Sequence, residues 1–265
     1  MFVDSHCHLN YPEFAPEMEH IRKAMSDAQV DRALIISTQL ETFQSVCDLA
    51  TLYDNFWCTV GVHPDEDQVL EPTEEDLLTR ISWGKVVGIG ETGLDYYRLN
   101  GRTLGEMEWQ RERFRLHIRV AQKAQLPLII HTRDASEDTL RILKEEGEDG
   151  RVGSVGGVFH CFTENWEVAQ AALDLGFYIS FSGIVTFKNA HQIKEVAQKV
   201  PLERMLIETD SPYLAPAPHR GKTNNPSFVP FVAQEVAKLK GISIEEVAQA
   251  TSLNFENLFQ KTKIV

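Results

Sequence analysis

Six side chains of the types that bind metal ions each follow a short apolar run in this sequence. His6 and His8 are two residues apart, and in a β-strand this spacing places both imidazoles on one face, where they can bind one ion. The remaining four are spread along the chain: Glu91, His131, His160 and Asp210. This distribution predicts a metal site assembled from the ends of several strands.

The number of candidate ligands indicates two ions rather than one. One tetrahedral ion needs fewer ligands than four imidazoles and two carboxylates, whereas two ions that share a bridging carboxylate would use all six. Glu91 is the expected bridge. Two ions about 3.5–4 Å apart can hold a hydroxide and stabilise both the attacking and the leaving oxygen of a phosphate ester, which favours hydrolysis. Magnesium, manganese and zinc all remain candidates, because imidazoles favour zinc and phosphoryl chemistry often uses the other two.

Each candidate also has an ordinary structural interpretation. A single histidine after an apolar run is more often a hydrogen-bonded core or surface residue than a ligand. Asp210 could instead cap a turn, since Asp-Ser-Pro is a turn signal. The ligand interpretation is favoured because the six residues together complete a site.

The apolar runs that precede these residues predict a parallel β-barrel. Eight short runs resemble buried strands, at residues 2–3, 32–36, 56–60, 85–90, 127–130, 155–159, 176–181 and 205–209. Helical periodicity occurs between them, most clearly in the window 104–125. We therefore expect a (β/α)8 TIM barrel that forms a single domain over residues 1–265. In such a barrel the carboxyl ends of the strands converge, as the metal site requires.

Composition limits the classes of partner and location. The net charge of −13 provides no general basic surface for nucleic acid, so a polyanionic substrate would need a local patch or bound cations. The four cysteines lack CxxC pairing and no signal pattern precedes His6, which predicts reduced thiols in the cytoplasm. No apolar run approaches the ~18 residues needed to cross a bilayer. We expect no membrane association and find no sign of an obligate protein partner.

Several ordered motifs resemble those of the TatD family of metal-dependent deoxyribonucleases, within the amidohydrolase-like TIM-barrel superfamily. They are Asp4-Ser5-His6-Cys7-His8-Leu9, Gly61-Val62-His63-Pro64, Gly90-Glu91-Thr92-Gly93-Leu94-Asp95-Tyr96, Ile130-His131-Thr132-Arg133, His160-Cys161-Phe162, Glu208-Thr209-Asp210-Ser211-Pro212 and Pro218-His219-Arg220-Gly221-Lys222. The resemblance covers nearly the whole chain.

The resemblance implies a division of the ligands between two ions. His6, His8, Glu91 and Asp210 would hold one ion, and Glu91, His131 and His160 would hold the second. It also implies a 3′-to-5′ exonuclease activity on DNA. His63 would contact a substrate phosphate or a water, although a histidine before proline can equally cap a loop.

Three basic residues are candidates for phosphate binding, because guanidinium and ammonium groups donate to phosphate oxygens. They are Arg133 after the fifth strand and, in the loop that follows Asp210, Arg220 and Lys222. Surface solvation or pairing with acidic residues is the alternative for each.

Three further groups of residues lie next to the candidate ligands. Glu208 shares a strand face with Asp210 and could orient a ligand, and Asp95 could support the loop after Glu91 or end a turn. Cys7 and Cys161 are interpreted as packing residues.

These observations favour a phosphodiester hydrolase, and the resemblance implies a deoxyribonuclease, which we expect to act on short or single-stranded DNA ends. Asp210 is the expected acid/base residue and Glu91 the bridging catalytic residue. Two alternatives remain: hydrolysis of an amide, lactone or aminoacyl ester by the same activated water, and a non-catalytic metal-binding barrel.

Overall fold

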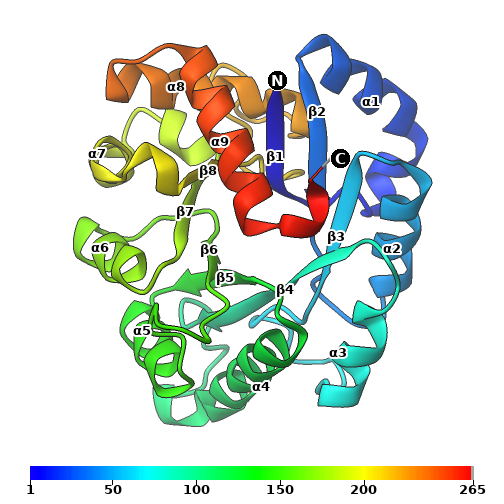
Figure 1. Ribbon diagram of the computed structural model, residues 1–265, viewed down its shortest axis with the longest axis vertical. Helices are drawn as coiled ribbons and strands as arrows, with labels where there is room; N and C mark the ends of the chain where they lie inside the picture. Colours follow the sequence, from blue (N-terminus) through cyan, green and yellow to red (C-terminus); the bar gives the residue numbers. More distant parts are fainter. Residues whose placement is uncertain (264–265) are drawn as a thin grey trace.

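The computed structural model describes residues 1–263, and its eight parallel strands form one sheet in which each strand pairs with the next along the chain (Figure 1). The strands are β1 (Phe2–Cys7), β2 (Val30–Ile35), β3 (Phe56–Val60), β4 (Val86–Asp95), β5 (Leu128–Arg133), β6 (Gly157–Phe159), β7 (Tyr178–Phe181) and β8 (Met205–Ile207). The sheet curves into a barrel, so the expected (β/α)8 fold is confirmed.

Helices surround the strands on the outside of the barrel (Figure 1). The α-helices are α1 (Met18–Asp27), α2 (Phe43–Leu52), α3 (Glu74–Ile81), α4 (Glu108–Ala124), α5 (Ser136–Glu145), α6 (Trp166–Asp174), α7 (His191–Lys199), α8 (Val229–Lys240) and α9 (Ile244–Leu258). Short 3-10 helices are η1 (Pro12–Glu17), η2 (Leu104–Met107), η3 (Gly183–Thr186), η4 (Leu202–Arg204), η5 (Pro226–Phe228) and η6 (Gln260–Thr262). None of the helices within residues 1–263 is both long and apolar enough to cross a membrane.

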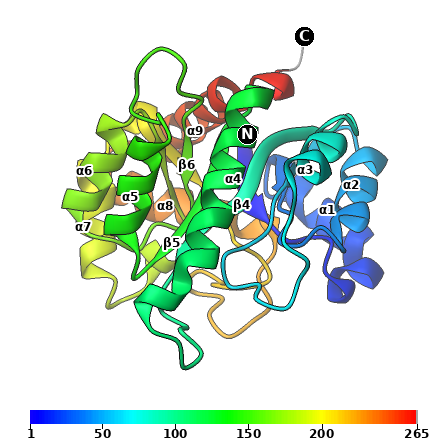
Figure 2. The ribbon, with the colours of Figure 1, turned by 90° about the horizontal axis from the view of Figure 1, so that it is seen from below.

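The last helix covers the amino end of the barrel. Phe255 of α9 and Phe259 just after it are fully buried. They pack on the apolar side chains that fill the barrel interior at its amino end. These interior side chains are Val3, Leu34, Ile36, Trp57, Val87, Ile129, Val158 and Leu206. Figure 2 shows α9 at one end of the molecule and the loops after β3, β4 and β8 gathered at the other. Within residues 1–263, the barrel interior is therefore filled at the α9 end (the plugged end) and open at the end that carries these loops.

The seam between β1 and β8 is closed by a few specific hydrogen bonds. Cys7 and Ser211 form an isolated parallel bridge, and the His8 amide donates to the Ser211 carbonyl at 2.9 Å. The Asp210 amide donates to the His6 carbonyl, also at 2.9 Å. The segments that carry His6, His8 and Asp210 are thus fixed to one another through their own backbones.

A buried carboxylate reinforces this seam. Asp4 accepts hydrogen bonds from the backbone amide of Thr209 at 3.0 Å and from the Thr209 hydroxyl. Burial, only partly offset by these bonds, raises the pKa of Asp4 to about 7. Asp4 therefore joins the first strand to the segment just before Asp210.

The fourth strand is longer than the sequence indicates. The apolar run ends at Gly90, yet β4 continues to Asp95 because Thr92 through Asp95 pair with Ile130 through Arg133 of β5. Gly93 permits this close pairing, since a Cβ there would lie 2.0 Å from the carbonyl oxygen of His131. Glu91 is consequently held inside a strand rather than at the end of one.

Candidate metal centre

A pocket of about 720 Å³ lies at the carboxyl end of the barrel and contains most of the predicted metal ligands in its wall. His8, Glu91, His131, His160 and Asp210 line it directly. His6 is fully buried just behind them, with its Nε2 atom 3.3 Å from Glu91 Oε2. The structure thus brings all six predicted ligands together.

Glu91 lies at the centre of the group, and one of its oxygens faces the residues of the β1–β8 seam. Glu91 Oε2 is 3.3 Å from His6 Nε2 and 4.0 Å from His8 Nε2. Asp210 Oδ1 is 3.6 Å from the same atom of His6 and 3.4 Å from that of His8. Two imidazoles and two carboxylates therefore surround one position.

The other oxygen of Glu91 faces the residues of β5 and β6. Glu91 Oε1 is 2.8 Å from His160 Nε2 and 3.2 Å from His131 Nδ1. His63 Nε2 approaches the same oxygen at 3.3 Å. The carboxylate of Glu91 thus has a separate set of nitrogen neighbours on each side, which is the arrangement expected of a bridging ligand.

The buried nitrogen atoms at the seam fit a metal site. Neither ring nitrogen of His6 has a hydrogen-bond partner within residues 1–263, nor does His8 Nδ1. Buried polar atoms without partners are costly, and imidazole nitrogens beside carboxylates are the donors that zinc and related divalent ions prefer. The donor set therefore suits divalent cations.

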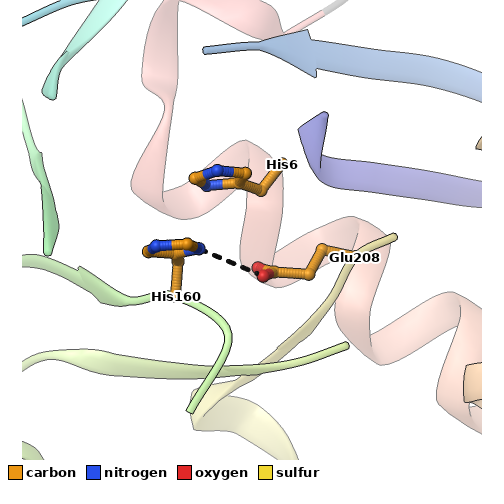
Figure 3. Close-up of side chains that lie close together, drawn as sticks. All are labelled: His6, His160 and Glu208. Carbon is orange, nitrogen blue, oxygen red and sulfur yellow. Dashed lines mark hydrogen bonds and ion pairs between the residues drawn. The ribbon is translucent and has the colours of Figure 1, made fainter. Parts of the chain in front are cut away.

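His160 is oriented by Glu208 from behind. Its Nδ1 lies 3.3 Å from Glu208 Oε1 (Figure 3). Its Nε2 lies 2.8 Å from Glu91 Oε1. Glu208 also accepts from the Cys161 amide at 2.8 Å and from the Ser180 hydroxyl. With the proton held on Nδ1 by Glu208, His160 Nε2 keeps its lone pair for a cation.

His131 has an equivalent partner in Asp95. His131 Nε2 lies 3.0 Å from Asp95 Oδ2, which leaves Nδ1 for the Glu91 side. Asp95 therefore does more than end a turn. It lies four residues after Glu91 on the same strand, a spacing that returns to the same face and could have indicated this role.

The electrostatics keep the carboxylates ionised. Burial alone would raise the pKa of Glu91, but the neighbouring imidazoles of His160, His63 and His131 hold this pKa well below its usual range. Burial also opposes ionisation of Asp210, yet a hydrogen bond from His8 lowers the pKa of that carboxyl. Burial, reinforced by His160, lowers the pKa of His6 and favours the neutral form that binds metals.

The position of His63 is fixed by helix α4. Buried His117 accepts from the Val62 amide at 3.1 Å and has its Nδ1 2.8 Å from the Arg113 carbonyl. The Arg113 guanidinium donates to the carbonyls of His63 and Glu66 at 3.0 and 2.7 Å. Sequence reasoning missed both α4 residues, because nothing in a helical window shows which loop its buried polar side chains will hold.

The predicted phosphate contacts divide into two groups. His63 and Arg133 line the pocket, and the Arg133 guanidinium lies 3.6 Å from the centre of the Tyr97 ring. Arg220 and Lys222 are exposed and do not belong to the pocket wall, and the Arg220 guanidinium lies 4.0 Å from the centre of the Phe187 ring.

One expectation about the cysteines is wrong. Cys7 packs in the apolar layer between barrel and helices, as expected, but Cys161 lines the pocket. Its backbone has φ +41°, so it leaves the regular strand alternation on which the expectation was based.

Comparison with known proteins gives a consistent result. Residues 3–260 match the family model described as TatD related DNase. The uncharacterized metal-dependent hydrolase YcfH of Escherichia coli strain K12 is 46% identical over 261 residues, which cover 97% of this chain and 95% of YcfH. The uncharacterized metal-dependent hydrolase YabD of Bacillus subtilis is 41% identical over 98% of this chain and 99% of its own length.

A solved structure agrees with this result. The crystal structure of YjjV, a TatD homolog from Escherichia coli K12, superimposes with a TM-score of 0.89 at 27% identity and 98% coverage of both chains.

Proposed function

Since this chain belongs to the TatD family and is a metal-dependent hydrolase, we propose that it hydrolyses phosphodiester bonds at the ends of short or single-stranded DNA. The observation that carries the proposal is the position of Glu91, whose two oxygens face two separate groups of imidazoles. Such a bridge is typical of two-metal sites that cleave phosphate esters.

The ligand set assigns roles to the acidic residues. Two divalent ions held by these residues would supply Lewis acidity toward the phosphate and acidify the attacking water. Asp210 accepts the proton of that water, because its side chain remains 15% exposed in the pocket and its lowered pKa keeps the carboxylate ionised and able to accept. Glu91, with 4% of its side chain exposed, holds the two halves of the site together.

The charge of the pocket makes cations a requirement for substrate binding. Five carboxylates line it, against two guanidinium groups: Asp65, Glu66, Glu91, Asp95 and Asp210 against Arg98 and Arg133. With neutral histidines the wall has an excess of three negative charges, which repels a phosphate. Two divalent cations would reverse the sign.

His63 and Arg133 are suited to contact the phosphate directly. His63 Nδ1 accepts from the Asp65 amide at 3.0 Å, so the proton of a neutral His63 resides on Nε2, which faces Glu91 and the pocket. His63 is therefore a donor to a substrate oxygen or a water. Arg133 has no acidic partner among residues 1–263 and can donate to a phosphate, while Arg220 and Lys222 would reach only phosphates farther along the strand.

The shape of the barrel favours a strand end as substrate. Apolar side chains and α9 fill the amino end of the barrel, so the pocket is closed at its base. Such a pocket admits the end of a DNA strand more readily than a continuous duplex. The 3′-to-5′ direction is carried over from the resemblance to the family. Oligonucleotides blocked at one end or the other test it.

The first experiment measures trimming of a labelled single-stranded DNA oligomer. Chelator-stripped protein is re-supplied with magnesium, manganese or zinc, beside Asp210→Asn and Glu66→Gln. Glu66→Gln is the matched control, because this substitution also removes one negative charge from the pocket but at a residue outside the ligand set. We expect metal-restored trimming that Asp210→Asn lowers by ~10²–10³-fold, chiefly in kcat, and that Glu66→Gln retains.

The opposing result is equally clear. Protein that rebinds metal but cleaves no DNA with any ion would refute the proposed function. Turnover of a parallel panel of amides, lactones and aminoacyl esters would then assign the same site to those bonds.

A further inference from the structure

Two tyrosines form part of the pocket wall beside the seam ligands, and the proposed chemistry leaves them unused. Tyr11 follows β1 and Tyr213 follows β8, and both line the pocket. The Tyr11 ring stacks on the His8 ring, with centroids 5.2 Å apart and planes at 19°. The Tyr213 ring meets Tyr11 edge-on, with centroids 6.4 Å apart and planes at 76°. The two rings therefore form a continuous aromatic surface next to a predicted metal ligand.

Tyr213 is exposed although its backbone is rigidly held. The residue as a whole is 54% exposed. Its amide donates to the Asp210 carbonyl at 3.0 Å, and its carbonyl accepts from Asn224 Nδ2. Fully buried Asn224 also donates to the Thr209 carbonyl at 2.9 Å. The ring is thus presented to the pocket at little cost in backbone entropy, as a binding surface requires.

Cationic and aromatic groups face the pocket from different loops. Arg133, positioned on the Tyr97 ring, comes from the end of β5, whereas Tyr11 and Tyr213 come from the seam. In a nucleotide the phosphate and the base are separated by one sugar, so a molecule held by its phosphate at the ligands places a planar base nearby. Leu214 and Ile184 extend the apolar part of the same wall.

We propose that Tyr213, supported by Tyr11, is a stacking surface for an unpaired nucleobase of the substrate. The inference rests on the proposed function and specifies its substrate class: single-stranded nucleic acid whose bases are free to stack. Stacking on an aromatic ring tolerates every base, because every base has a π-face. The enzyme is then selective for unpaired ends but indifferent to their sequence.

The test compares a substrate with bases and one without. Pentadeoxythymidylate is set beside a chain of the same length with tetrahydrofuran residues in place of every nucleoside, and kcat and KM are measured for wild type and Tyr213→Leu. We expect the wild type to favour the base-bearing chain by roughly ten-fold through KM, and Tyr213→Leu to lose this preference. The variant should turn over the baseless chain as the wild type does.

Two further variants separate stacking from other effects. Tyr213→Phe keeps the ring and should keep the preference. Trp83→Leu removes another exposed aromatic residue, which lies outside the pocket wall. This variant should leave kcat and KM unchanged for both substrates. Thermal unfolding of Tyr213→Leu establishes that the fold is intact, as expected for an exposed side chain.

The outcomes distinguish the inference from the proposed function. If no chain is cleaved by the wild type, the proposed function itself fails. If both chains are cleaved equally well, or Tyr213→Leu retains the wild-type preference, the nuclease stands and the stacking surface is refuted.

Discussion

The two ends of the barrel use the same strands for opposite purposes. On β5, Ile129 packs in the apolar interior and His131, two residues later, faces Glu91. The same step leads from Val158 to His160, and from Leu206 to Glu208. Because residues two apart share a strand face, each of these three strands directs an apolar side chain to the plugged end and a polar side chain, near or just after its carboxyl end, to the pocket end.

This difference shows how the fold can contain buried charge. Burial of apolar side chains at the plugged end stabilises the folded protein. Buried charges at the pocket end destabilise it where they lack a partner of opposite charge. Changes at the two ends should therefore have separable effects, on stability at one and on metal binding and activity at the other. Four substitutions test this separation.

The largest effect is expected for Glu91→Gln at the pocket end. Loss of the bridging charge should lower kcat/KM by at least ~10³-fold and reduce the metal content of the purified protein. The free energy of unfolding of the metal-free protein should change much less. Steady-state kinetics, elemental analysis and urea unfolding measure the three quantities, and a variant with wild-type turnover would exclude Glu91 as the bridge.

Phe255→Ala tests the plugged end. Removing a fully buried phenyl ring should lower the free energy of unfolding by about 3–5 kcal/mol, while kcat/KM at 25 °C remains that of the wild type. Urea unfolding and steady-state kinetics check the two halves. Phe255→Leu is the matched control with a smaller loss, and a selective loss of turnover in either folded variant would contradict the separation of the two ends.

The pH dependence of stability should come in part from His117. Burial lowers its pKa from 6.5 to about 4, so between these values the unfolded chain binds a proton that the folded protein does not. Stability is therefore lost as pH falls from about 6.5 to 4, by roughly 3 kcal/mol from this group. Between pH 7 and pH 4.5, His117→Gln should lose less free energy of unfolding than the wild type, as measured by urea unfolding at the two pH values. Equal losses in the two proteins would assign the acid sensitivity elsewhere.

The smallest effect is expected for Glu208→Gln. This change leaves all six predicted metal ligands in place but weakens the hydrogen bond between His160 Nδ1 and residue 208. Affinity for zinc should therefore fall by about 10–100-fold. Competition with a chromogenic chelator measures it. Lys199→Gln, on the outer surface of α7, is a control of unchanged affinity. If Glu208→Gln binds zinc with the affinity of the wild type, the hydrogen bond to Glu208 is not needed to orient His160.

The sequence predicted the barrel and the grouping of ligands because both depend on local signals. Short apolar runs that end in histidine or a carboxylate mark strands and their carboxyl ends at once. The extension of β4 to Asp95 was not predictable in this way, because it depends on pairing with β5 and on the close approach at Gly93.

Side chains on loops were harder to place. Arg133 lines the pocket, whereas the equally basic Arg220 extends over Phe187 outside the wall, and charge alone does not distinguish them. The stacking surface was also missed, since the position of Tyr213 depends on buried Asn224, eleven residues farther along the chain. Long-range hydrogen bonds of this kind leave no periodic signal in a sequence.

The seam between β1 and β8 has a consequence for biosynthesis. Asp4 and Thr209, which join it, are 205 residues apart, so His6 and His8 leave the ribosome long before Asp210 is synthesised. A nascent chain, or one terminated before residue 210, holds the first two imidazoles but lacks the carboxylate that completes their side of the site. Because the His6 and His8 side of the site is incomplete before Asp210 is synthesised, we expect no hydrolytic activity from a nascent chain or a truncated product that ends before this residue.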